Sequence, residues 1–221
     1  MQAGGLVRGG PGAGLLAAAA LLAGCNLVGP IAYYLRPPQI QKPEFKLSES
    51  GRVAVLIESG RGVQESPVFA ESLYNQIVEI SRVRKSATEF VPLGDVYALR
   101  RSRPDFASLS VQRIGRELNA EQVLYVRIDE LRTRESPDLP VVEPSVSVRC
   151  SVVGVHALPD MARLWPSEGE GRRETATRQA QMAAGPPDVD LALSKLAKDL
   201  AWRITVPFFE TDLETPLPVA R

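Results

Sequence analysis

The sequence is poor in the residues that most catalytic and metal sites need. It has one histidine, His156, and two cysteines, Cys25 and Cys150, and its 26 basic and 26 acidic side chains leave no net charge. One histidine provides little for a Ser-His-Asp triad or a zinc site. A neutral chain has no bulk attraction to nucleic acid, so we expect no nucleic-acid partner. We also expect a protein that is not an enzyme, with no catalytic residue, metal or cofactor.

Long hydrophobic runs are absent as well. The apolar run Leu15–Ala23 is shorter than the ~20 apolar residues that a transmembrane helix needs. Arg8 precedes it, and no acidic residue occurs before Cys25. A short positive region followed by an apolar run of this length is typical of a secretory signal peptide.

The end of this run carries a more specific signal. Leu22-Ala23-Gly24-Cys25 resembles the lipobox of bacterial lipoproteins. The resemblance implies a signal peptide over residues 1–24, cleavage between Gly24 and Cys25, and fatty acylation (palmitate) of Cys25. Two acyl chains hold a protein stably at a bilayer, whereas one holds it marginally. Two alternatives stay open: an ordinary signal peptide with an incidental cysteine, and an amino-terminal membrane anchor.

The resemblance also implies a location in the cell. In the sorting pattern of many Gram-negative lipoproteins, a residue other than aspartate after the lipidated cysteine, here Asn26, indicates the outer membrane. We therefore expect a protein of the cell envelope that is lipid-anchored, faces the periplasm, and lies at the outer rather than the inner membrane.

Composition divides the rest of the chain into three parts. Residues 25–48 are rich in proline and predict a semi-rigid, extended linker. Residues 49–210 alternate between strand and helix periods and predict one α/β domain. Residues 211–221 predict a flexible tail.

The first half of the domain predicts alternating strands and helices. The expected elements are a buried strand over 52–58, a helix capped by Ser66 and running to Val83, a strand over 89–93, a short helix over 95–99 followed by a loop over 100–107, a helix capped by Ser110, and a strand over 122–131. Gly60-Arg61-Gly62 lacks the lysine and third glycine of phosphate-binding loops, so we interpret it as a plain connection.

The second half is richer in strands. Residues 145–158 alternate clearly and place Cys150 on an apolar face, where it is expected to be buried. Residues 161–165 and 172–178 predict two arms of a hairpin, and Asp188 is expected to cap a final helix. The whole pattern predicts an α/β three-layer sandwich with a mixed β-sheet.

One segment is similar to known families. Ile114–Val126, with Gly115 and Ala120, resembles a helix-to-strand segment of bacterial periplasmic domains: the curli-secretion lipoproteins, the lipoprotein activators of penicillin-binding proteins, and the amino-terminal domain of the Tol propeller protein. The resemblance implies close packing of a helix on a strand at Gly115. Asn119 replaces the more usual glycine, and channel-forming hairpin segments are absent, so the resemblance implies a fold rather than a pore.

One basic cluster remains. Arg100, Arg101 and Arg103 form a candidate patch for an anionic ligand, although a solvated loop explains the same charges. We expect a lipid-anchored accessory or scaffold protein that binds another envelope protein. The alternative is a ligand-binding or transport-accessory lipoprotein with a pocket for a lipid or glycan.

Overall fold

The computed structural model describes residues 40–87, 89–133, 141–182 and 185–212. The main elements are β2 (Arg52–Ser59), α2 (Pro67–Val83), β3 (Glu89–Phe90), α3 (Leu93–Ser102), α4 (Val111–Glu117), β4 (Gln122–Arg132), β6 (Ser145–Gly154), β7 (Arg163–Trp165), β8 (Arg172–Thr177) and α5 (Pro186–Thr205). Short elements complete the described part: β1 (Ile40–Gln41), η1 (Phe106–Ser108), β5 (Val141–Val142), η2 (Pro159–Met161), β9 (Gln181–Met182), η3 (Val206–Phe208) and β10 (Thr211–Asp212).

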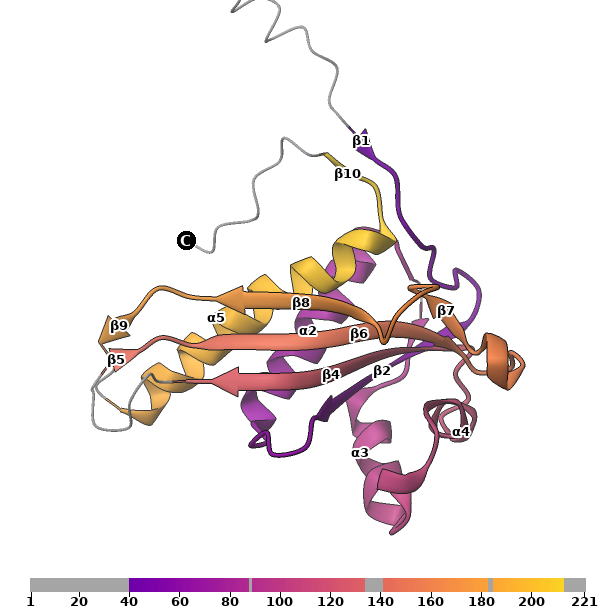
Figure 1. The fold of residues 1–221 in the computed structure, drawn as a ribbon, viewed down its shortest axis with the longest axis horizontal. Helices are drawn as coiled ribbons and strands as arrows, with labels where there is room; N and C mark the ends of the chain where they lie inside the picture. Colours follow the sequence, from indigo (N-terminus) through magenta and orange to yellow (C-terminus); the bar gives the residue numbers. More distant parts are fainter. Residues whose placement is uncertain (1–39, 88, 134–140, 183–184, 213–221) are drawn as a thin grey trace, which may run out of the picture. The chain divides into compact units, whose positions relative to one another are not determined.

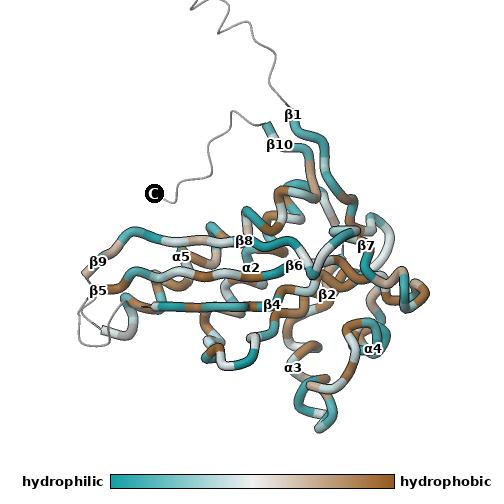
Figure 2. Tube along the Cα trace, viewed as in Figure 1, coloured by the Kyte–Doolittle hydropathy of each residue, from teal (hydrophilic) through white to brown (hydrophobic). Residues whose placement is uncertain are grey.

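The main sheet is mixed, as predicted. Its strand order is β3-β2-β4-β6, and β7 and β8 both pair with β6. Strand β2 is parallel to β3 and to β4, whereas β4, β7 and β8 are antiparallel to β6. In Figure 2, β2 is mostly brown and β8 mostly teal, which matches their places inside the sheet and at its edge.

Helices cover both faces of the sheet, which confirms the α/β fold. On one face, α2 and α5 lie side by side (Figure 1). They bury the larger core, to which Val55, Val126 and Val148 of the sheet belong. On the other face, α3 and α4 cover a smaller core that includes Ala54 and Leu56. The second layer therefore covers only one end of the sheet.

Local capping follows the predicted pattern in the first half of the domain. The Ser66 and Ser110 side chains accept hydrogen bonds from the backbone N–H groups of Phe69 and Arg113, both at 3.3 Å. Such bonds satisfy donors that have no partner in the first helical turn. Both helices consequently begin where the sequence indicates.

Four predicted elements are corrected by the structure. The strand predicted over 89–93 ends at Phe90, because Pro92 precedes α3. The loop predicted over 100–107 begins instead with the last turn of α3, which reaches Ser102, and η1 follows. The strand predicted over 145–158 ends at Gly154. Finally, α5 begins at Pro186 with Gly185 as its cap, so Asp188 lies inside the first turn.

The hairpin predicted over 161–178 is also wrong. Strands β7 and β8 do not pair with each other; each pairs with a different stretch of β6, β7 with Val152 and Val153, and β8 with residues 145–150. Strand β6 is long enough to pair with both β7 and β8 along one edge. Pairing of each strand with β6 therefore replaces the predicted pairing of β7 with β8.

Some predicted segments lie outside the described residues. These are the signal peptide over 1–24, the predicted cleavage site between Gly24 and Cys25, the linker from Cys25 to residue 39, and the tail from residue 213. The last part of the predicted linker packs on the domain: Leu47 is buried, and the backbone N–H of Glu44 donates to the carbonyl of Pro207 at 2.8 Å. Within the described ranges, no helix is both long and apolar enough to cross a bilayer.

The helix-to-strand segment at Gly115 is closely packed. A Cβ atom on Gly115 would lie 2.5 Å from Val155 Cγ2 and 2.8 Å from Val123 Cγ2. Asn119 adopts a left-handed conformation, with φ of 51°, directly after α4. Glycine, and next to it asparagine, tolerates this conformation best, so asparagine fits this position.

We predict that Gly115→Ala lowers the free energy of unfolding by roughly 1–2 kcal/mol, since overpacking costs ~1–3 kcal/mol and alanine gains at most ~1 kcal/mol in helix propensity. Chemical denaturation measures the change. Gly94→Ala in α3 is the matched control, because a Cβ there meets nothing within 4 Å. Val155→Ala in the Gly115→Ala background should recover part of the loss; equal stability of both glycine variants would contradict the prediction.

Candidate functional site

The three predicted arginines occupy the end of α3 and the residue after it. Arg100 and Arg101 lie in the last turn, and Arg103 is the C-terminal cap of the helix. Of the three, Arg101 alone has no ion-pair partner among the described residues. The cluster is therefore less open to an anionic ligand than its sequence indicates.

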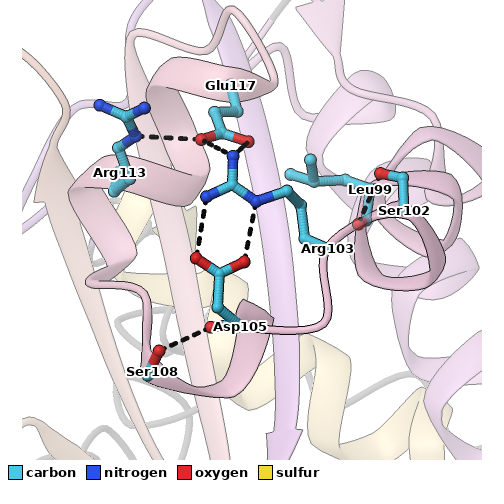
Figure 3. Close-up of polar contacts among 7 residues, drawn as sticks. All are labelled: Leu99, Ser102, Arg103, Asp105, Ser108, Arg113 and Glu117. Carbon is cyan, nitrogen blue, oxygen red and sulfur yellow. Dashed lines mark hydrogen bonds and ion pairs between the residues drawn. The ribbon is translucent and has the colours of Figure 1, made fainter.

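Arg103 is held between two carboxylates, as Figure 3 shows. Its Nε and Nη2 donate to the two oxygens of Asp105 at 2.9 and 3.0 Å, and its Nη1 donates to Glu117 Oε1 at 3.0 Å. Arg113 adds a further bond to the same Glu117 oxygen at 3.0 Å. The hydrogen bond with Arg103 lowers the pKa of Asp105 and raises that of Arg103. Arg103 thus ties the loop after α3 to α4.

Arg100 turns toward the sheet instead. Its guanidinium lies 5.1 Å from the centre of the Phe106 ring, and its Nη2 is 4.0 Å from Glu58 Oε1. That separation is too long for a hydrogen bond. Within the described part of the chain, the Arg100 guanidinium donates no hydrogen bond, although the side chain is only 36% exposed. It therefore retains N–H donors for a ligand.

A cavity of about 210 Å³ opens beside Arg100. It lies where β2 ends, between the start of α2 and helix α3. Seven apolar residues form most of its wall: Val55, Ile57, Pro67, Ala70, Leu93, Val96 and Ile128. The polar groups are Ser59, Glu65, Ser66, Glu71, Tyr97 and Arg100. Ligands of α/β proteins often bind outside the carboxyl ends of sheet strands, and this cavity lies at the carboxyl end of β2. Gly60-Arg61-Gly62, interpreted from the sequence as a plain connection, does not line it.

Glu58 and Tyr125 meet beside this cavity on the α3 side of the sheet. The Tyr125 hydroxyl donates to Glu58 Oε2 at 3.0 Å. Burial, followed by the negative charge of Glu58, raises the pKa of Tyr125 to about 12. The phenol therefore acts as a neutral hydrogen-bond donor that orients Glu58.

Two further reactive side chains, those of Cys150 and Asp129, are held by structural contacts. Cys150 is buried, as predicted, and burial raises the pKa of its thiol to about 12, which suppresses the reactive thiolate. Asp129 sits at a bulge in β4 and bonds Arg149 at 2.7 Å and Arg127 at 3.1 Å. Burial opposes its ionisation, but Arg149 and Arg127 together outweigh burial and lower the pKa of Asp129. In the described ranges, no three His, Cys, Asp or Glu side chains gather as a metal site would require.

A second surface feature lies between α2 and α5. Ile80, Val83 and Trp202 line an open groove of about 260 Å³ together with Arg84 and Lys198. Arg84 lies over the Trp202 ring at 5.2 Å and over the Phe209 ring at 5.3 Å. Val83 is 68% exposed. We call this surface the helix-pair groove.

Comparisons with known proteins find only low sequence and structural similarity. No protein-family model and no curated protein matches the chain. Among solved structures, PelC from Paraburkholderia phytofirmans, a dodecamer, shares 16% identity over 78% of this chain and 96% of its own, with a TM-score of 0.40. Lipoprotein GNA1162 from Neisseria meningitidis shares 12% identity over 68% of this chain and 97% of its own, with a TM-score of 0.39. Hypothetical protein CT253 from Chlamydia trachomatis shares 16% identity over 72% of this chain and 94% of its own, with a TM-score of 0.41. At these values none of them defines the function of this chain.

We predict that Glu58→Gln lowers the pKa of Tyr125 from about 12 toward, but not to, its ordinary value of 10.0, because burial remains after the charge is removed. A raised folded-state pKa stabilises the fold below the unfolded-state value, so this stabilisation is lost as pH rises from 10.0 to about 12. Carbon NMR of labelled tyrosine measures the titration, and Tyr125→Phe assigns the resonance. Glu65→Gln is the control; an unchanged Tyr125 pKa in Glu58→Gln would refute the role of Glu58.

Proposed function

We propose that the protein is lipid-anchored through Cys25 in the cell envelope, where its domain is a non-enzymatic accessory that binds another envelope protein. The lipobox resemblance of residues 22–25 supports the anchor. The helix-pair groove carries the binding proposal, because the exposed Val83 and the partly exposed Ile80 of α2 lie there beside Trp202 of α5.

The composition of the groove suits a protein interface. Trp and Arg are over-represented among the residues that dominate binding energy, and apolar centres with polar rims are usual. Here Trp202 and Arg84 stack at one end, Ile80 and Val83 supply apolar area, and Lys198 lies at the rim. A partner that places a large apolar side chain between Ile80 and Trp202 would remove this area from water.

Rigidity adds to the suitability of this surface. The two helices are fixed against each other by their shared core and by a contact between the Ser72 and Ser194 hydroxyls at 3.1 Å. Preformed surfaces lose little conformational entropy on binding. The groove therefore offers a partner a fixed template.

We predict that Cys25→Ser abolishes both labelling by radioactive palmitate and retention in the membrane fraction, because the anchor is the acyl chains. Cys150→Ala is the control: it removes the other thiol and should leave labelling and retention unchanged. Full membrane retention of the Cys25→Ser protein would show that the anchor is something else.

We predict that a photocrosslinking amino acid at position 83 forms a discrete adduct with one envelope protein in intact cells. The same group at Thr175, exposed on the outer strand β8, should form none. Once mass spectrometry identifies the partner, Val83→Glu should weaken its binding to the purified protein about tenfold, the equivalent of ~1.4 kcal/mol. The fold should be unaffected, because Val83 is largely exposed.

Thr175→Glu is the matched control for the added charge and should bind the partner as the unchanged protein does. Adducts of equal yield at positions 83 and 175, or equal partner affinity for the two glutamate variants, would remove the helix-pair groove as the binding surface.

A further inference from the structure

The cavity beside Arg100 exists because β3 is short. Strand β3 pairs only with Arg52 and Val53 of β2, whereas β4 pairs with β2 as far as Ser59. After Phe90 the chain bends at Pro92 and enters α3. Beyond Val53, the edge of β2 that β3 would cover is flanked instead by α2 and α3, and the cavity occupies the space between them.

The uncovered edge presents backbone groups to this cavity. Alternate residues of a strand point their N–H and C=O groups to opposite neighbours. The Val53 carbonyl accepts from Val91 on the β3 side, and the Gly60 N–H donates to Ile128 on the β4 side. Val55 and Ile57 therefore face the β3 side, where no backbone partner follows among the described residues. Such groups are normally paired, so a bound ligand with its own polar atoms has donors and acceptors to meet.

The size of the cavity limits the ligand. Typical small-molecule pockets enclose roughly 300–1,000 Å³, and this one encloses about 210 Å³. A lipid acyl chain needs a longer channel, and a glycan needs many more polar partners. The wall formed by Val55, Leu93, Val96 and Ile128 suits one apolar group of side-chain size.

The charged groups of the lining decide the ligand's polar part. The Arg100 guanidinium is partly buried and donates no hydrogen bond among the described residues, so it can bind a carboxylate. Glu65 and Glu71 are more exposed and line the same cavity, where they can bind an ammonium group. One guanidinium and two carboxylates beside an apolar wall match a small zwitterion with an apolar body.

We propose that this cavity binds a free apolar α-amino acid. Its side chain fills the apolar interior, its carboxylate pairs with Arg100, and its ammonium group faces Glu65 and Glu71. This binding site is separate from the helix-pair groove, so neither proposal depends on the other.

Isothermal titration of the full-length protein in detergent tests the proposal. The probes are L-leucine and L-phenylalanine, with three analogues of leucine: 4-methylpentanoate, which lacks the ammonium group, 3-methylbutylamine, which lacks the carboxylate, and N-acetyl-L-leucine, which resembles the end of a peptide. We expect at least one amino acid to bind and each leucine analogue to bind about tenfold or more weakly than leucine, since each loses a charge-assisted contact.

Variants locate the site. Arg100→Gln should weaken leucine binding about tenfold or more, and Arg101→Gln, its exposed neighbour on α3, should leave binding unchanged. Ala70→Met fills the cavity without altering a charge and should abolish binding. Thermal melting checks the fold of each variant, and if Arg100→Gln does not fold, Ala70→Met carries the test.

Four results would overturn the proposal. Absence of binding by both amino acids would remove the ligand class, and equal binding of N-acetyl-L-leucine would point to the end of a peptide. Equal effects of Arg100→Gln and Arg101→Gln, or full binding by Ala70→Met, would place the ligand elsewhere. None of these results bears on the adduct expected at Val83.

Discussion

Burial of β2 on both of its faces is the constraint on which the rest of the domain depends. Val53 and Val55 must be covered on one face, and Ala54 and Leu56 on the other. The chain meets this requirement by sending α2 across one face and α3 and α4 across the other before it returns as β4. Parallel strands flanked in this way need helices on both sides. The three-layer architecture is therefore a consequence of one short apolar strand.

The same constraint produces the cavity. Pro92 cannot donate a ladder hydrogen bond, and the chain turns into α3 directly after it, so β3 covers only the first part of β2. Helices cannot approach a strand edge as closely as another strand does, because their side chains intervene. The space left over lies beside Val55 and Ile57, and the partly buried Arg100 reaches its wall from α3. The cavity is thus a result of strand length and not of an irregular loop.

Much of the fold could be predicted from the sequence, whereas little of the candidate site could. The apolar stripe of α2, its Ser66 cap and the alternation of β6 are local signals, and the structure follows them. The pairing of β7 and β8 depends on the length of β6, which local patterns do not encode. The arginine cluster shows the same limit: Arg103 and Arg100 find carboxylates at Glu117 and Glu58, and their distances in sequence give no hint of contact.

The positive and negative charges of the chain are also paired in space. Arg103, Arg149 and Arg172 each contact at least one carboxylate within the described part of the chain, so much of the positive charge is paired internally. Exposed pairs of this kind add little stability, but they remove broad basic surfaces that would attract polyanions. In the two proposals made above, recognition depends on the cations that keep donors or ring contacts at a concave surface. These are Arg100 at the cavity and Arg84 at the helix-pair groove, and both lie against aromatic rings that fix their direction.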